Sequence, residues 1–217
     1  IETLKGKKTK TPIWLMRQAG RHLPEYIKIR QKYKDLMEMF LDPEVITNIS
    51  LQPVQRYGLD ACIVFSDILM IPYASGCDVS FKEGVGPQVK FNERFNFASH
   101  KLDPVIKGIE NIKKASEVPL IGFVGGPWTT LLYCLFDKEE RSQMNKGLIH
   151  KNEKIINTHI ENLTDIISNY AAQQVNAGID AFQIFESAAE DLEDEYFDRW
   201  CLKPTQKIIH SIKSKTD

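Results

Sequence analysis

Two ten-residue segments of this chain share one pattern, and that pattern constrains the fold more than any other feature. They read GLDACIVFSD (58–67) and GIDAFQIFES (178–187), with the common frame Gly, aliphatic, Asp-Ala, two residues, aliphatic, Phe. Each follows an amphipathic stretch and starts at a glycine placed where a helix C-cap belongs. We interpret them as one helix-turn-strand unit used twice, the competing explanation being that such turns resemble one another generally.

Short apolar runs alternate with longer amphipathic stretches along the whole chain. We expect strands over 12–16, 61–65, 118–124 and 181–186. Helices are expected over 105–115 and over 152–176, where apolar residues recur at steps of three and four. Another helix begins at Asp42 as N-cap, with Pro43 in the first helical position. The strand runs are continuously apolar, which is typical of parallel strands covered by helices, so the sequence predicts an α/β fold.

Composition narrows the possible classes of function. The chain has 217 residues, 42% of them hydrophobic, and a net charge of −1, which gives no general attraction to nucleic acid or to an anionic membrane. We expect a basic N-terminal arm over 1–10 and a single domain over 11–217. We find no signal-peptide pattern and no apolar run of about eighteen residues, so we expect a cytoplasmic protein. The scattered cysteines, without C-x-x-C or H-x-C spacing, are expected to be reduced and to hold no metal.

Polar side chains follow the carboxyl ends of the expected strands. Arg17 and Arg21 follow the first strand, Asp67 the second, Tyr133 the third and Ser187 the fourth. Ligands of parallel α/β folds bind at this edge, and arginine forks bind carboxylates bidentately. We therefore expect these side chains to share one cleft. Ordinary surface arginines, a helix-capping aspartate and a core tyrosine are the alternatives at the same positions.

Four segments carry a resemblance to a known family. PIWLMRQAGRHLPEY (12–26) and GFVGGPWTTLLY (122–133) resemble the two signatures of the uroporphyrinogen decarboxylase family, and FSDIL (65–69) and IFES (184–187) match further landmarks in the same order. The resemblance implies a (β/α)₈ TIM barrel with its cleft at the C-terminal ends of the strands, and a homodimer. A whole barrel has about 250 residues, so we expect only the N-terminal four or so β/α units in this chain.

The resemblance also implies an activity and a set of site residues. The activity is decarboxylation of the four acetate side chains of uroporphyrinogen III to methyl groups, which gives coproporphyrinogen III and CO₂ in haem biosynthesis without cofactor or metal. Catalysis would rest on Asp67, Arg17 and Tyr133. Substrate contacts would come from Arg17, Gln18, Ala19, Gly20, Arg21, Arg30, Asp67, Tyr133 and Ser187.

Three other interpretations stay open at this stage. The chain resembles only the first half to two thirds of the enzyme, and no residue matches the histidine that the family places near its later strands. A truncated tetrapyrrole binder without turnover is therefore one alternative. A corrinoid methyltransferase of the same superfamily is another, although the missing H-x-C zinc spacing counts against it. The third is an α/β domain with no ligand.

Overall fold

The fold is known from a computed structural model that describes residues 2–7, 10–82, 86–91 and 95–214. In chain order its elements are α1 (Pro24–Arg30), α2 (Leu36–Phe40), α3 (Pro43–Tyr57), β1 (Cys62–Ile63), α4 (Met70–Ala74), β2 (Asp78–Lys82), β3 (Gly86–Lys90), α5 (Asp103–Ala115), β4 (Leu120–Gly125), α6 (Pro127–Leu135), α7 (Lys138–Ser142), α8 (Lys146–Asn176), β5 (Ala181–Phe185), α9 (Asp194–Phe197) and α10 (Lys203–Lys213). Short 3₁₀ turns lie at Ser99–Leu102 and Ala189–Asp191, and a π-helical turn, η3, spans Asp198–Leu202.

The ends of α3 and α8 follow from local sequence. The Asp42 side chain accepts hydrogen bonds from the backbone N–H groups of Glu44 (2.9 Å) and Val45 (3.2 Å), which caps α3. Gly58 ends α3 with a φ of +63°, and Gly178 follows α8 with a φ of +101°. Both angles lie in the left-handed region that glycine adopts without a steric penalty. The predicted N-cap and both predicted C-terminal glycines are confirmed.

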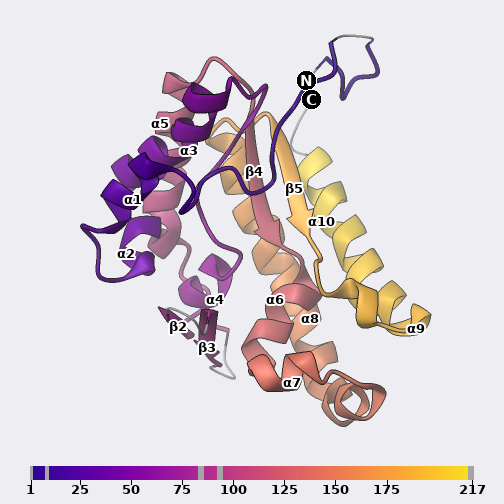
Figure 1. Cartoon of the computed structure of the whole chain (residues 1–217). Coiled ribbons are helices and arrows are strands. Elements are labelled where there is room, and N and C mark those ends of the chain that lie inside the picture. The colour runs from indigo at the N-terminus through magenta and orange to yellow at the C-terminus, as the bar shows by residue number, and fades with distance from the viewer. Residues whose placement is uncertain (1, 8–9, 83–85, 92–94, 215–217) are drawn as a thin grey trace. The chain divides into compact units, whose positions relative to one another are not determined.

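The central sheet has the strand order β1-β4-β5, and its strands are parallel. Cys62 of β1 lies opposite Leu120 of β4 in a parallel register. Between β4 and β5, the N–H of Asp180 donates to the carbonyl of Leu120 (2.7 Å), and the N–H of Gly126 donates to the carbonyl of Phe185 (2.8 Å). The numbering thus rises in the same direction along both strands, as the arrows in Figure 1 show. The predicted α/β class with a parallel sheet is confirmed.

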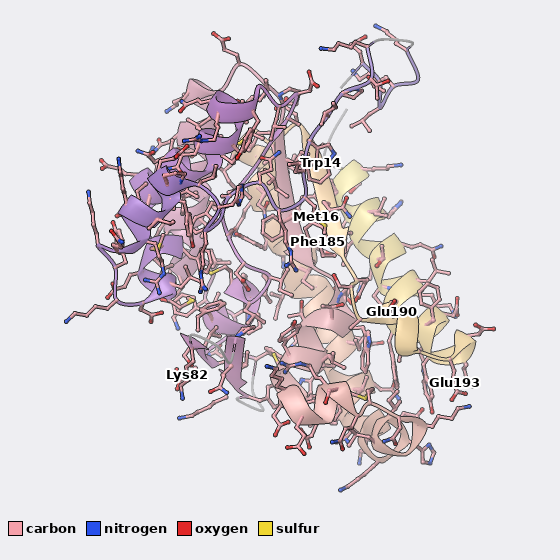
Figure 2. The ribbon with its side chains drawn as sticks, in the orientation of Figure 1. Trp14, Met16, Lys82, Phe185, Glu190 and Glu193 are labelled. Carbon is pink, nitrogen blue, oxygen red and sulfur yellow. The ribbon has the colours of Figure 1, made fainter. Side chains whose placement is uncertain are left out.

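The strand expected over 12–16 does not form, and this prediction is wrong. The segment contacts the sheet at its start, where the N–H of Ile13 donates to Oδ2 of Asp60 (2.8 Å) and the N–H of Asp60 donates to the carbonyl of Ile13 (2.9 Å). Figure 2 labels Trp14 and Met16 on this segment, and Met16 is exposed. The described residues therefore contain three neighbouring parallel strands where four are expected.

A side chain takes the place of the missing strand. The Nε2 of Gln18 donates to the carbonyl of Ala61 (2.9 Å), and its Oε1 accepts from the N–H of Ile63 (3.2 Å). A residue of a parallel strand would make these two bonds with its own backbone. Because the Gln18 amide satisfies the free edge of β1, the backbone of residues 12–16 is not needed there.

Two further differences concern the strands. The second expected strand, over 61–65, is reduced to Cys62–Ile63. An antiparallel pair, β2 and β3, forms a separate small sheet, which the apolar runs of the sequence do not predict. Glycine and proline occur within this hairpin, and its side chains are largely exposed or half-buried, so it lacks the continuous apolar character on which the strand predictions rest.

The chain divides into two compact units. The first contains residues 1–67, 100–123 and 173–183, and the second contains residues 68–99, 124–172 and 184–217. In the first unit, α3 packs against α5, and a buried cluster joins α1, α2 and α3 through Leu23, Tyr26, Met39, Val45 and Ile49. In the second unit, the indole rings of Trp128 and Trp200 are fully buried and stack with their centroids 5.4 Å apart.

The N-terminal arm expected over 1–10 falls partly outside the described residues, which omit positions 1, 8 and 9. Residues 2–7 are exposed, and Lys7 forms an ion pair with Glu2. Among the described residues, no helix combines the length and the apolar character needed to cross a membrane.

Candidate functional site

The loop that carries Arg17 and Arg21 is bound to the β1 segment by the side chain of Gln18. Arg17 and Arg21 are exposed, whereas Gln18 between them is only 2% exposed and makes the two bonds to β1 described above. The N–H of Leu23 donates to the carbonyl of Gly20 (3.0 Å), which turns the chain into α1. Both the oxygen and the nitrogen of the Gln18 amide bind the backbone of the β1 segment, so this side chain fixes the loop between two exposed arginines.

One apolar cluster supports both the arginine loop and the segment that leads to Asp67. Ala19 and Phe65 pack against the cluster that contains Leu23 and Tyr26. The Phe65 ring meets the Tyr26 ring edge-on, with centroids 6.1 Å apart. The arginine loop and the segment that follows β1 therefore pack against the same apolar cluster in the first unit. This packing restrains the backbone close to Arg17, Arg21 and Asp67.

A hydrogen bond from α3 fixes the backbone just before Asp67. The hydroxyl of Ser50, which is buried, accepts from the N–H of Phe65 (2.8 Å) and donates to the carbonyl of Ile46 (2.7 Å). Asp67 itself is half-buried. This places a carboxylate at the carboxyl end of β1 on a backbone that α3 restrains.

Arg21 and Arg30 both act on Tyr26. Burial raises the pKa of the Tyr26 hydroxyl, and the positive charges of Arg30 and Arg21 act in the opposite direction. The Arg30 guanidinium also donates to the carbonyl of Tyr33 (2.6 Å), which anchors it at the end of α1. Two of the predicted carboxylate-binding arginines therefore lie within electrostatic range of one buried phenol.

Tyr133 and Ser187 belong to the second unit. Tyr133 lies on α6, as the sequence predicts, and is half-buried with the Arg141 guanidinium 4.2 Å above the centre of its ring. The same guanidinium donates to the carbonyl of Phe136 (2.6 Å), just after α6 ends. Ser187 is exposed and follows β5. The structure thus places seven of the nine predicted site residues in the first unit and these two in the second.

Glu186, next to Ser187, is not among the nine predicted site residues, although three hydrogen bonds hold its carboxylate. Its carboxylate accepts from the N–H of Trp128 (2.9 Å), the N–H of Thr129 (2.8 Å) and the Thr129 hydroxyl (2.7 Å). Burial raises the pKa of Glu186, while the bonds from Thr129 and Trp128 oppose that shift. An acidic residue directly after a predicted strand, next to Ser187, is the sequence signal that could have identified it.

Comparison with known proteins decides the family. The sequence model of the uroporphyrinogen decarboxylase (URO-D) family matches residues 1–217, the whole chain. The chain belongs to the uroporphyrinogen decarboxylase family. It is 39% identical over 223 aligned residues to the uroporphyrinogen decarboxylases of Rickettsia rickettsii (strain Sheila Smith) and Rickettsia conorii (strain ATCC VR-613 / Malish 7), which covers 98% of this chain. The chain spans 64% of the length of these two curated relatives.

A solved structure supports the fold of this uroporphyrinogen decarboxylase family member. A methyltransferase from Methanosarcina mazei matches with a TM-score of 0.74 over 97% of this chain and 65% of that chain. The two sequences are 20% identical, so the likeness concerns the fold alone. The methyltransferase interpretation of the chain gains no support from it, whereas the family match extends over every residue.

The cysteines of this chain are not paired in disulfides. All four are buried thiols. Burial raises the pKa of Cys62 to about 12, and burial together with the charge of Glu186 raises that of Cys201. Thiolate chemistry needs a lowered pKa, so the raised values favour a packing role for Cys62 and Cys201. Within the described ranges, no three His, Cys, Asp or Glu side chains are grouped to hold a metal ion.

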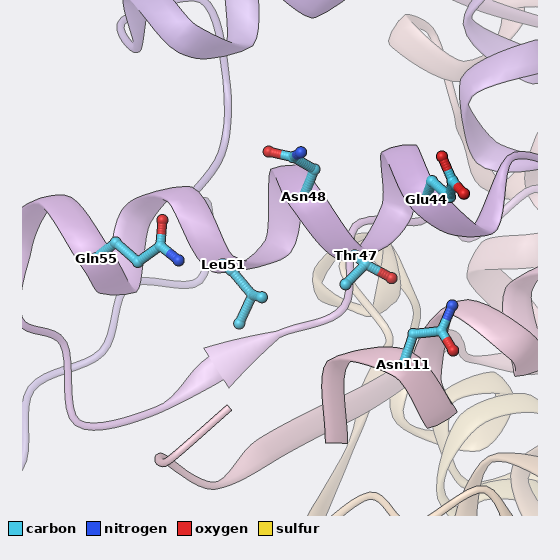
Figure 3. Close-up of a pocket in the computed structure, with 6 residues that line it drawn as sticks. All are labelled: Glu44, Thr47, Asn48, Leu51, Gln55 and Asn111. Atoms are coloured by element: carbon cyan, nitrogen blue, oxygen red, sulfur yellow. The ribbon is translucent and has the colours of Figure 1, made fainter. Parts of the chain in front are cut away.

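A polar groove lies between α3 and α5 in the first unit. Its volume is about 430 Å³, and Figure 3 shows the side chains that line it: Glu44, Thr47, Asn48, Leu51, Gln55 and Asn111. None of the nine predicted site residues is among them. Its lining carries a single carboxylate and no cationic group, so the groove is unsuited to a polyanionic substrate.

Proposed function

We propose that this chain takes part in the decarboxylation of the four acetate side chains of uroporphyrinogen III to methyl groups, which yields coproporphyrinogen III in haem biosynthesis. The observation that carries the proposal is the family match over the whole chain. The common apolar support of the arginine loop and the Asp67 segment adds a physical reason, because it allows cations and an acid to face one ligand.

Arg17 and Arg21 bind substrate carboxylates in this proposal, and Arg30 assists them. Uroporphyrinogen carries four acetate and four propionate groups, so its recognition requires several cationic side chains on a restrained backbone. Guanidinium forks bind carboxylates through two parallel N–H bonds. The buried Gln18 amide restrains the loop backbone through its two hydrogen bonds. The small residues Ala19 and Gly20 leave room for a ligand near that backbone.

Asp67 stabilises charge during the reaction. Protonation of the pyrrole carbon next to an acetate-bearing carbon makes the ring cationic. The bond between the acetate methylene and its carboxylate then breaks, CO₂ leaves, and the electron pair moves into the ring. Protonation of the methylene carbon gives the methyl group, and the ring proton is returned, so each acetate consumes one proton overall. A fixed carboxylate beside the pyrrole N–H groups stabilises the cation by about 3 kcal/mol, the scale of a lost oxyanion donor.

Tyr133 and Ser187 complete the site in this proposal. Tyr133 contributes a phenol from α6, and Ser187 a hydroxyl from the end of β5. Arg17 orients the reacting acetate rather than moving a proton, because a guanidinium stays protonated. We further propose a cytoplasmic homodimer that uses no cofactor or metal, on the support of the family resemblance.

The test is an anaerobic assay with uroporphyrinogen that measures coproporphyrinogen and CO₂, run beside a binding titration. The complete gene product is expected to bind and to turn over. Asp67→Asn is expected to bind while turnover is lost, and Arg17→Ala is expected to weaken binding. Binding without product in the unaltered protein would favour a tetrapyrrole binder. Unchanged turnover in Asp67→Asn would overturn the role given to that carboxylate.

A further inference from the structure

The N-terminus of α6 has no capping side chain of its own. Its N-cap residue is Gly126, and Pro127 follows as the first helical residue. The first N–H groups of a helix lack partners within the helix. At α6 two of them, on Trp128 and Thr129, donate to the carboxylate of Glu186, which comes from the end of β5, 58 and 57 residues further along the chain. A distant residue thus caps this helix.

Several other contacts join the same two segments. The Thr129 hydroxyl donates to Glu186 and accepts from the N–H of Ala188 (3.2 Å), and the indole Nε1 of Trp128 donates to the carbonyl of Ala188 (3.0 Å). A Cβ atom on Gly126 would lie 2.2 Å from the Glu186 carboxyl carbon, so the backbone there leaves space only for a hydrogen. The start of α6 and the turn after β5 therefore form one bonded block.

We propose that Glu186 is a positioning residue: its carboxylate sets the orientation of α6, and with it Tyr133, relative to the turn that carries Ser187. The inference rests on the proposed function, in which both residues line the substrate site. Tyr133 lies less than two helical turns after Thr129, so a shift at the start of the helix moves the phenol by a similar distance. Misplacing a catalytic group by about 1 Å can lower a rate 100-fold.

The three hydrogen-bond donors at the start of α6 require a carboxylate at position 186. Glu186 presents two oxygens, and the three donors all point at them. Glutamine has nearly the same shape, but its NH₂ group would face either the N–H of Trp128 or that of Thr129, so one backbone donor would lose its acceptor. Aspartate keeps both oxygens but is one methylene shorter.

The first experiment measures hydrogen exchange of the peptide that covers residues 127–135. Glu186→Gln is expected to raise the exchange of the Trp128 and Thr129 amides. Glu190→Gln is the matched control, because Glu190 is exposed and lies close by in sequence, on the turn at Ala189–Asp191 (Figure 2). Equal exchange in the two variants would overturn the positioning role, and this readout does not depend on any activity.

The second experiment is a kinetic double-mutant cycle in the complete gene product. Glu186→Gln is expected to lower kcat about tenfold to 100-fold while KM changes little. In a Tyr133→Phe background the same substitution should have little further effect, because the positioned phenol is already gone. Additive losses in the cycle would show that Glu186 does not act through Tyr133. If the unaltered protein lacks turnover, the proposed function fails, and the exchange result still decides whether Glu186 holds α6.

Discussion

Asp60 holds Ile13 by the same pair of hydrogen bonds with which Asp180 holds Leu120. In both pairs a carboxylate oxygen of the aspartate accepts from the partner's N–H, and the aspartate's N–H donates to the partner's carbonyl. The four distances lie between 2.7 and 2.9 Å. The pattern shared by residues 58–67 and 178–187 therefore reflects a repeated structural unit, in which each aspartate fixes a residue at or near the start of the neighbouring segment.

Replacing these aspartates should have unequal effects. Asp60→Ala removes one exposed bond and is expected to destabilise the fold by about 1 kcal/mol. Asp180→Ala is expected to cost more, because its carboxylate accepts a partly buried hydrogen bond from the N–H of Leu120 and also pairs with Lys113. Urea unfolding measures both. A larger loss from Asp60→Ala would contradict this ranking.

The buried amide of Gln18 is expected to be essential to stability. Gln18→Leu keeps the volume but leaves the carbonyl of Ala61 and the N–H of Ile63 without partners, at about 1–3 kcal/mol each. Gln31→Leu, at an exposed position, is the control and should change the free energy of unfolding by less than about 0.5 kcal/mol. Similar unfolding midpoints for the two variants would argue that Gln18 does not replace the missing strand.

A methyl group at position 126 should collide with Glu186. Gly126→Ala is expected to destabilise the protein by about 1–3 kcal/mol, and by clearly less when Glu186→Ala is also present. Gly147→Ala is the control, since its Cβ would come no closer than 3.2 Å to the one neighbouring side chain within reach. The measurement is a double-mutant cycle of unfolding free energies, and an unchanged cost in the double variant would count against the contact.

The ion pair between α1 and α3 should make stability depend on acid pH. Arg56 binds both carboxylate oxygens of Glu25 at 2.7 Å and lowers the pKa of that carboxyl from 4.5 to about 2. A lowered carboxyl pKa stabilises the folded state above the unfolded value, and the contribution is lost as the pH falls through the folded value. Compared with Glu25→Gln, the unaltered protein should therefore be more stable at pH 7, and the difference should vanish between pH 4.5 and about 2.

Denaturation of the two proteins at several pH values checks this dependence. Because the pair is exposed, added salt should reduce the difference at pH 7 as well. A difference that stays constant down to pH 2 would assign the effect of the substitution to helix propensity instead.

The sequence predicts the features that depend on neighbouring residues. The N-cap at Asp42 and the glycines that end α3 and α8 can be recognised from a few adjacent residues, and the structure confirms them. The prediction of a strand over 12–16 is wrong although the segment is apolar. The Gln18 side chain makes the hydrogen bonds to β1 that the backbone of such a strand would make. Periodicity in a sequence does not reveal that a side chain replaces a backbone.

The site shows the same division. Tyr133 was placed on a helix that starts at Pro127, and this is confirmed because proline and the following apolar residues signal the helix locally. The hydrogen bonds of Glu186 are not predictable from the sequence, because its partners Trp128 and Thr129 lie more than fifty residues away and only the folded chain brings them together. The roles of Arg17, Arg21 and Asp67 toward a ligand stay predictions.

The bonds between Asp180 and Leu120 also fix how β5 is aligned with β4. Asp180 directly precedes β5 (Ala181–Phe185), and Glu186 directly follows it. A slip of one residue in a parallel pair would turn every side chain to the opposite face. We therefore expect a misalignment at Asp180 to displace Glu186 at the other end of the same strand.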